Sequence, residues 1–365
     1  MQTAGEPCSI YFHIPFCTKK CPYCHFYVIP NRSLYHPQLL EALHLEWERQ
    51  SHLLENKAIT SIYFGGGTPI LFDGIKDLLE WIPRENDCEI TVEANPEDAS
   101  DSTFFKLREW GVNRLSIGVQ SLDDRSLQTL ERIHCAEKAK QAIHNAHKAG
   151  FQNISIDLMY DLPDQSEEGW RYTLDSLDDL PIQHISLYNL VIEPHTSFYK
   201  RQIQPCGGIK SLRLLDAALK KFEKSGFTRY EISAFAKVDR QSRHNIGYWT
   251  ARPFLGFGPS AYSYWNGERF RNIANLHRYA RALKEGQSPI DFTETLSYPA
   301  NVKELLAVQL RLIEGVDIRT FALPESTMQA LTKLQGQGLL EHSAHQWRLT
   351  TQGTYFYDTV ATEII

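Results

Sequence analysis

Residues 9–24 read SIYFHIPFCTKKCPYC, a mostly apolar run followed at once by three cysteines. The apolar and aromatic residues of 9–14 predict a buried strand, after which Cys17, Cys21 and Cys24 share one loop. Thiols at this spacing are typical of a metal centre. The sequence therefore predicts that a metal-binding loop follows the first strand.

Two kinds of metal centre fit this loop. A structural zinc needs four ligands, and Cys8, His13 and His25 are the candidates for the fourth. A [4Fe–4S] cluster normally takes four thiolates, so three of them would leave one iron open to substrate or cofactor. The other cysteines beyond residue 80 are isolated, which counts against a second pair of zinc ligands.

Strand-like and helical segments alternate after this loop. Both kinds of segment recur over the first half of the chain. The expected strands are 9–14, 60–65, 88–95, 113–120, 153–160 and 184–192, and the expected helices are 39–55, 74–82, 102–111, 124–133, 137–150 and 167–180. Repeated βα units predict a parallel sheet, as in an α/β barrel, a partial barrel or a doubly wound sheet.

Polar residues gather where these strands end. The cysteine loop follows the first strand and GGGTP (65–69) follows the second, while Glu93, Gln120 and Asp157 lie near the ends of the next three. Because the carboxyl ends of parallel strands share one mouth, we expect these groups to line one pocket. GGGTP is not a phosphate loop, because the Gly-Lys-Ser/Thr ending is absent.

Composition narrows the class of protein. The net charge is −6 and the charges are interspersed, so nucleic acid is not the expected partner. No apolar run is long enough to span a bilayer, and the first residues do not resemble a secretory signal. We expect a cytoplasmic protein whose seven cysteines are thiols or metal ligands.

The cysteine loop resembles that of radical S-adenosylmethionine (SAM) proteins. CTKKCPYC matches their C-x3-C-x-aromatic-C signature, and GGGTP resembles the segment that approaches the methionine end of the cofactor. The motifs YFHIPFC, EANP, GVNRLSIGVQS, RIH, IDLMYDLP and YEISAFA follow, over about residues 10–275, the pattern of oxygen-independent coproporphyrinogen III oxidase-like proteins.

The resemblance implies a fold, cofactors and site residues. It implies a partial (β/α)6 barrel, which we expect over 1–235 with an extension over 236–298. The helical pattern that begins near Pro299 separately predicts a helical domain over 299–365, with a winged-helix-like arrangement as one alternative and a plain packing domain as the other. Cys17, Cys21 and Cys24 would hold a [4Fe–4S] cluster. The residues around SAM would be Tyr11, Tyr23, Gly66, Gly67, Thr68, Glu93, Gln120, Arg132 and Asp157.

Two branches of this family differ in function. The oxidases, which decarboxylate coproporphyrinogen III, carry a further cysteine where this chain has Phe26, and they have an N-terminal extension that is not seen before the first strand here. Both differences favour the heme-chaperone branch (HemW). The resemblance then implies that heme is bound and passed to acceptor hemoproteins, with a membrane surface and a homodimer as further expectations.

The motif HNIGYW (244–249) matches the H-N-x-x-Y-W motif associated with heme in the chaperone branch. The resemblance makes His244 the expected axial ligand, with Asn245, Tyr248 and Trp249 around the porphyrin. We expect this motif in an ordered loop.

A radical reaction on some other tetrapyrrole stays open as a further alternative, because motifs for cofactor binding do not identify the substrate.

Three residues depart from the usual pattern: His25, where Asp is common, and Asp161 and His195, where Gly is common. Glycine at position 161 would permit a positive φ or a close approach of the cofactor, so the loop after the fifth strand, which carries Asp161 instead, is expected to be reshaped.

Overall fold

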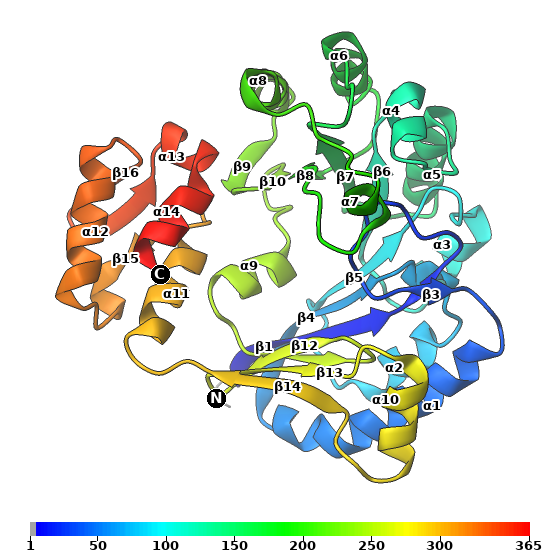
Figure 1. Cartoon of the computed structure of the whole chain (residues 1–365). Helices are drawn as coiled ribbons and strands as arrows, with labels where there is room; N and C mark the ends of the chain where they lie inside the picture. The colour runs from blue at the N-terminus through cyan, green and yellow to red at the C-terminus, as the bar shows by residue number, and fades with distance from the viewer. Residues whose placement is uncertain (1–4) are drawn as a thin grey trace.

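A computed structural model describes residues 5–365 (Figure 1). Six parallel strands lie side by side in chain order. They are β1 (Glu6–Ile14), β4 (Lys57–Gly66), β5 (Glu89–Ala94), β6 (Arg114–Gln120), β7 (Ile154–Tyr160) and β8 (His184–Asn189). All six were predicted from the sequence. Both faces of most of these strands are buried, as in a parallel sheet covered by helices on one side and closed around an interior on the other.

Each strand is followed by helices on the outside of the sheet. They are α1 (Tyr35–Gln50), α2 (Ile75–Trp81), α3 (Asp101–Glu109), α4 (Asp124–Thr129), α5 (Ala136–Lys148), α6 (Glu167–Asp175), α7 (Ser197–Lys200) and α8 (Gly208–Lys224). Side chains of Ser100, Asp123 and Ser166 accept hydrogen bonds from the first turns of α3, α4 and α6. These caps fix where the helices start, and the (β/α)6 pattern predicted from the sequence is confirmed.

The barrel is open between its first and sixth strands. The outer neighbour of β1 is β11, and that of β8 is β10, so β1 and β8 do not pair. Helix α9 lies in this gap against β1 and β4 (Figure 1). The predicted partial barrel is therefore confirmed.

The segment after α8 completes the sheet on both sides. Its elements are β9 (Thr228–Glu231), β10 (Ala234–Ala236), α9 (Arg243–Trp249), β11 (Phe254–Phe257), β12 (Tyr262–Trp265), β13 (Glu268–Asn272), α10 (Leu276–Lys284) and β14 (Ile290–Thr295). Buried Glu46 of α1 anchors this segment, because it accepts hydrogen bonds from Gly258 N (2.8 Å), Asn272 Nδ2 (2.6 Å) and the Tyr279 hydroxyl.

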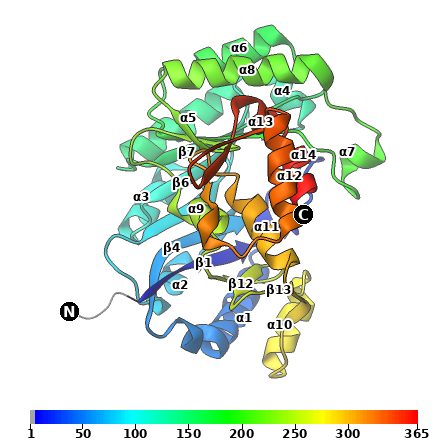
Figure 2. The ribbon, with the colours of Figure 1, turned by 90° about the vertical axis from the view of Figure 1, so that its left-hand side faces the viewer.

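The last 66 residues have an apolar core of their own around Leu306, Leu331 and Val360. The elements are α11 (Ala300–Gln309), β15 (Val316–Asp317), α12 (Glu325–Gly336), β16 (Leu340–Ser343), β17 (Gln346–Leu349), α13 (Thr351–Tyr355) and α14 (Tyr357–Ile364). Figure 2 shows these helices in front of α9, on the open side of the barrel.

Two expectations about this half of the chain are wrong. HNIGYW is not in a loop but forms α9, because Ser242 caps the helix at Asn245 N and the Glu89 carboxylate accepts from the backbone N–H groups of Arg243 and His244 (both 3.0 Å). The segment TRYEISAFA (228–236) is predicted as one strand from its sequence, but it forms a hairpin of β9 and β10 with a register shift at Ala234. Both features depend on contacts with distant residues.

Two residues that replace a common glycine have positive φ. Asp161 has φ +65° and His195 has φ +69°, so both occupy the left-handed region that glycine favours. The Asp161 carboxylate accepts a hydrogen bond from Gly207 N (2.7 Å), which ties its loop to the start of α8.

We predict that His195→Gly stabilises the protein by about 0.5–1 kcal/mol. His195 is exposed and its side chain makes no hydrogen bond to a described residue, so glycine would remove the strain of positive φ at little loss. The midpoint of urea unfolding should rise in this variant. His195→Ala keeps the Cβ and is the control. An equal rise in both variants would show that the imidazole, not φ, is unfavourable.

Candidate functional site

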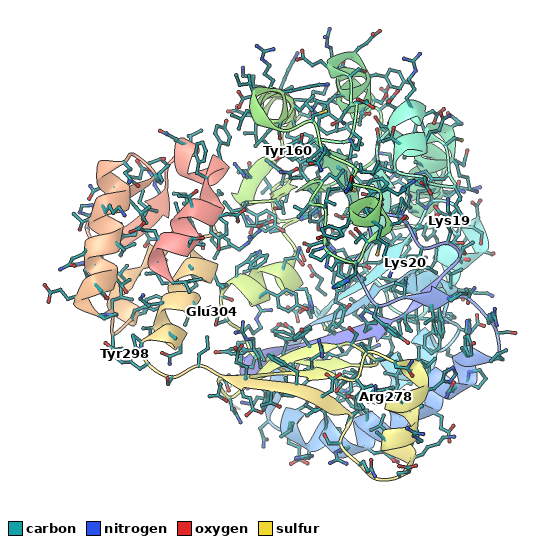
Figure 3. The ribbon with its side chains drawn as sticks, in the orientation of Figure 1. Lys19, Lys20, Tyr160, Arg278, Tyr298 and Glu304 are labelled. Atoms are coloured by element: carbon teal, nitrogen blue, oxygen red, sulfur yellow. The ribbon has the colours of Figure 1, made fainter. Side chains whose placement is uncertain are left out.

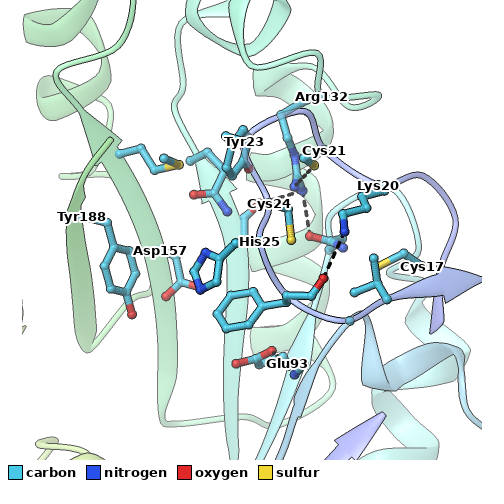
Figure 4. Close-up of a pocket in the computed structure, with 18 of the residues that line it drawn as sticks. Cys17, Lys20, Cys21, Tyr23, Cys24, His25, Glu93, Arg132, Asp157 and Tyr188 are labelled. Carbon is cyan, nitrogen blue, oxygen red and sulfur yellow. Dashed lines mark hydrogen bonds between the residues drawn. The ribbon is translucent and has the colours of Figure 1, made fainter. Parts of the chain in front are cut away.

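One cavity of about 460 Å³ opens at the carboxyl ends of the six strands (Figure 4). Ten of the residues predicted for the cluster and for SAM line it. They are Cys17, Cys21, Tyr23, Cys24, Gly66, Gly67, Glu93, Gln120, Arg132 and Asp157. They come from the cysteine loop, from the loop that carries Arg132 and from the ends of four strands, as expected for the mouth of a parallel α/β fold.

The three cysteines of the loop are free thiols in one wall of this cavity. Burial raises the pKa of Cys17 to about 11 and also raises that of Cys24. Two neighbours donate to the sulfurs: Thr68 Oγ1 to Cys17 Sγ (3.6 Å) and Arg132 Nη1 to Cys21 Sγ (3.3 Å). Donors of this kind stabilise the thiolates that bind iron, so the three cysteines and their two donors fit a [4Fe–4S] cluster site.

Among residues 5–365, no three His, Cys, Asp or Glu side chains converge closely enough to hold a single metal ion. A [4Fe–4S] cluster needs no such convergence, because each thiolate binds a different iron atom. The geometry of the loop is therefore compatible with a cluster.

The glycines of GGGTP are required by backbone packing. Gly66 has φ +108°, and a Cβ there would lie 2.6 Å from the His13 ring. A Cβ on Gly67 would lie 2.5 Å from the carbonyl oxygen of Phe16, just before the cysteine loop. Gly67 N and Thr68 N donate to the carbonyl groups of Ile14 and Phe16 (2.9 and 2.7 Å). The GGGTP segment thus packs on the backbone at the start of the cysteine loop and is hydrogen-bonded to it.

Two carboxyl groups face the cavity opposite the cysteines. Glu93 accepts hydrogen bonds from the Tyr63 hydroxyl (2.8 Å) and from Gly66 N (3.2 Å), and Asp157 accepts one from Ser116 (3.3 Å). Burial, and then the charge of Asp157, raise the pKa of Glu93 to about 7. Burial also raises the pKa of Asp157 to about 6. This pair would be stabilised by a cationic ligand.

Arg132 brings the cysteine loop and the strand ends together. Its Nη2 donates to Asn95 Oδ1 (2.7 Å) and to the Gly118 carbonyl (3.1 Å), and it pairs with Glu97 at 3.5 Å. Glu97 also accepts from His134 Nδ1 (2.9 Å). Asn95, Glu97 and His134 were not predicted as site residues, although they belong to the sequence segments EANPE and RIH.

Four of the residues predicted around SAM differ in their position relative to the cavity. Tyr23 lines the cavity and packs on Phe198, and Gln120 lines it at a bulge where its φ is +65°. Thr68 reaches the site only through Cys17 Sγ. Tyr11 is not in the cavity wall; its hydroxyl is bonded to His13 Nδ1 (3.1 Å), behind the GGGTP segment.

The HNIGYW residues are not in this cavity. His244 is 1% exposed in the barrel interior, where its Nδ1 is hydrogen-bonded to Ser61 Oγ (3.0 Å) and its Nε2 to the Tyr248 hydroxyl (2.8 Å). Its ring also stacks on Tyr63 at 4.9 Å. Both ring nitrogens are engaged, so an axial bond to heme iron would require α9 to move.

The end of the motif lies next to the C-terminal unit. Trp249 lies under the Arg311 guanidinium, 4.2 Å from its ring centre, and together with Tyr248 it lines a second cavity of about 240 Å³. The side chain of Asn245 makes no hydrogen bond to a described residue, although its backbone N–H is capped by Ser242. The structure therefore places this motif at a junction between the barrel and the C-terminal helices.

The mouth of the first cavity also contains residues that were not predicted to hold the cluster or SAM. They are Lys19, Lys20, His25, Phe26, Val28, Met159, Tyr188, Leu190, Val191 and Glu193. Apart from Met159, which is buried in β7, these residues lie in loops or beyond the buried part of β8, where the spacing of apolar residues cannot identify them.

Comparisons with known proteins agree on the relatives of this chain. The family model of the Radical SAM superfamily matches residues 11–177, and that of the HemN C-terminal domain matches residues 296–356. The heme chaperone HemW of Bacillus subtilis is 32% identical, over 94% of this chain and 96% of its own length. The heme chaperone HemW of Lactococcus lactis is 31% identical, over 95% and 94%.

A solved structure supports the fold. Coproporphyrinogen III oxidase (HemN) from Escherichia coli, a radical SAM enzyme, has a TM-score of 0.86 to this chain and covers 100% of it, with 91% of its own length covered. The identity of 22% restricts this likeness to the fold. Within residues 5–365, no helix has both the length and the apolar character needed to cross a membrane.

Proposed function

The chain belongs to the family of the heme chaperone HemW within the radical SAM proteins, and from this premise we propose that it binds heme and delivers it to acceptor hemoproteins. The observation that carries the proposal is the similarity to curated HemW proteins over nearly the whole chain. The HemN likeness is at a lower identity and leaves the oxidase reaction as the less supported alternative.

The cavity supports a resident [4Fe–4S] cluster and SAM. Cys17, Cys21 and Cys24 would hold three irons, leaving the fourth for the amino and carboxylate groups of SAM. Glu93 and Asp157 would face the cationic groups of the cofactor, and Arg132 would steady the loop that carries the cluster. Cluster and cofactor together supply one-electron chemistry when bound, and the proposed chaperone role does not depend on cleavage of the cofactor.

The remaining proposed residues divide into two groups. Tyr23 would lie against the adenosyl group, Gly66, Gly67 and Thr68 would support the methionine end, and Gln120 would close the far wall. Tyr11 would act from behind this segment through His13. For heme, we retain His244 as a ligand candidate, with Asn245, Tyr248 and Trp249 near it, on the condition that α9 opens.

We further propose that the protein is located in the cytoplasm, that it forms a homodimer and that its acceptor hemoproteins lie at a membrane surface.

We predict that the anaerobically reconstituted protein binds one heme per chain with a saturable Soret band. If α9 opens to give His244 to the iron, His244→Ala should shift this band and lower the affinity about tenfold or more. Tyr248→Phe is the matched variant, because it removes the hydroxyl bonded to Nε2 but keeps the ligand. Heme titration measures both. No saturable binding in the wild type would contradict the chaperone function.

A further inference from the structure

The mouth of the cluster cavity contains one imidazole whose nitrogens have no hydrogen-bond partner among residues 5–365. His25 is the single histidine among the residues that line this cavity, and its side chain makes no hydrogen bond or ion pair with residues 5–365. In contrast, both nitrogens of His244 are hydrogen-bonded within the barrel. Figure 4 shows His25 projecting from the cysteine loop over the cavity, on the side of Asp157 and Tyr188. An exposed imidazole can bind a metal without any rearrangement of the fold.

Apolar side chains surround this imidazole and are exposed to solvent. Phe26 is 54% exposed, with its ring centre 4.5 Å from that of His25, and across the mouth Tyr188 is 45% and Val191 is 59% exposed. Met159 and Leu190 line the wall between them. Exposed aromatic and aliphatic groups gathered on both sides of an opening are typical of a binding site for a flat apolar ligand.

Two cations lie on the same rim. Lys19 and Lys20 belong to the cysteine loop and line the cavity (Figure 3). Their ammonium groups donate only to backbone carbonyl groups, Lys19 to that of Glu131 (2.9 Å) and Lys20 to that of Phe26 (3.1 Å). Because neither is paired with a carboxylate among residues 5–365, both are available to the acidic groups of a ligand.

We propose that heme docks at this mouth, with the His25 imidazole as an axial ligand, Phe26, Tyr188 and Val191 against the porphyrin, and Lys19 and Lys20 at the propionates. The inference rests on the proposed heme-chaperone function and deepens it, because it names the site. Each chemical part of heme has a partner here: iron an imidazole, the ring aromatic faces, and the carboxylates two ammonium groups. The deeper part of the cavity, near the cysteines and Glu93, remains for the cluster and SAM.

The test is an anaerobic heme titration of the cluster-loaded protein, followed in the Soret region. His25→Ala should weaken heme binding about tenfold or more and shift the band, and free imidazole added to this variant should restore the wild-type spectrum. His52→Ala is the control, because His52 is exposed and does not line this cavity, and this variant should bind heme as the wild type does. Lys19→Ala/Lys20→Ala should weaken binding of heme but not of heme dimethyl ester, which has no free propionates.

The possible failures are distinguishable. Unchanged binding and an unchanged spectrum in His25→Ala would overturn the inference while heme binding by the wild type stands. No saturable binding in the wild type would overturn the proposed function itself. If His25→Ala also costs the protein its iron and sulfide, His25→Ala is introduced into a cluster-free variant in which all three cysteines are replaced by serine. Equal heme affinity of the cluster-free protein with and without His25 would overturn the inference.

Discussion

Replacement of any one of Cys17, Cys21 and Cys24 by serine is expected to abolish the iron–sulfur cluster. The three thiols come from one loop, so no other cysteine can take the place of a lost one: Cys8 and Cys88 are buried elsewhere, and Cys206 donates to the Leu162 carbonyl (2.9 Å). The wild type, reconstituted without oxygen, should contain about four iron and four sulfide per chain. Each variant should contain close to none.

Cys135→Ser is the matched control for this experiment. Cys135 is exposed, precedes α5 and makes no capping hydrogen bond with its side chain, so its replacement should leave iron and sulfide at the wild-type level. Iron and sulfide assays with an absorbance spectrum measure the result. Zinc without sulfide in the wild type would contradict the cluster and return the loop to a structural zinc site.

The cavity of the cluster could be predicted from the sequence because its parts are local. The cysteines share one loop, and Glu93, Gln120 and Asp157 sit at the ends of strands whose apolar residues are easily recognised. The direction of parallel strands then brings these residues to one mouth. No long-range contact had to be known in advance, and the cavity contains these residues as expected.

The surroundings of HNIGYW could not be predicted in the same way. Its helix depends on Glu89, which is 155 residues away from His244 in the sequence. The Glu89 carboxylate accepts hydrogen bonds from two backbone N–H groups of the first turn. Burial of His244 depends on Ser61 and Tyr63 of β4. The motif itself has no helical period in its apolar residues, so a pattern of a few residues could not show that tertiary contacts make it a helix.

The network behind Arg132 was missed for a related reason. Asn95, Glu97 and His134 do not line up with the strand ends in a way that indicates a site, and their roles follow from the position of the guanidinium between them. Arg132 itself was identified only through a family motif. A charged side chain that is satisfied by residues of three different segments can be recognised only when the segments are assembled.

The affinity of the cluster-loaded protein for SAM is expected to rise with pH up to about pH 7 and then to level off. Glu93 must be ionised to attract the cationic groups of SAM, and its pKa is raised to about 7 by burial and by Asp157. Below this pH the neutral acid predominates, so affinity should fall about tenfold per pH unit. The ionisation of Asp157, with a pKa of about 6, should steepen the fall at lower pH.

Two variants test which group causes this dependence. Glu93→Gln should lower the affinity at pH 8 by roughly a hundredfold and flatten the profile between pH 6 and 7, because a hydrogen bond to a charge is lost and no proton remains to titrate. Tyr63→Phe removes the hydroxyl whose hydrogen bond lowers the pKa of Glu93, so the midpoint should move to higher pH. Glu193→Gln, in the wall of the same cavity, should leave the profile unchanged.

Equilibrium dialysis of SAM across this pH range measures all four proteins. A wild-type affinity that does not change between pH 6 and 8 would contradict the role of Glu93. A profile that moves in Glu193→Gln but not in Tyr63→Phe would identify Glu193, and not Glu93, as the titrating group. Because Tyr63 also stacks on His244, heme titration of Tyr63→Phe would further show whether α9 responds to a change made at the SAM side of the barrel.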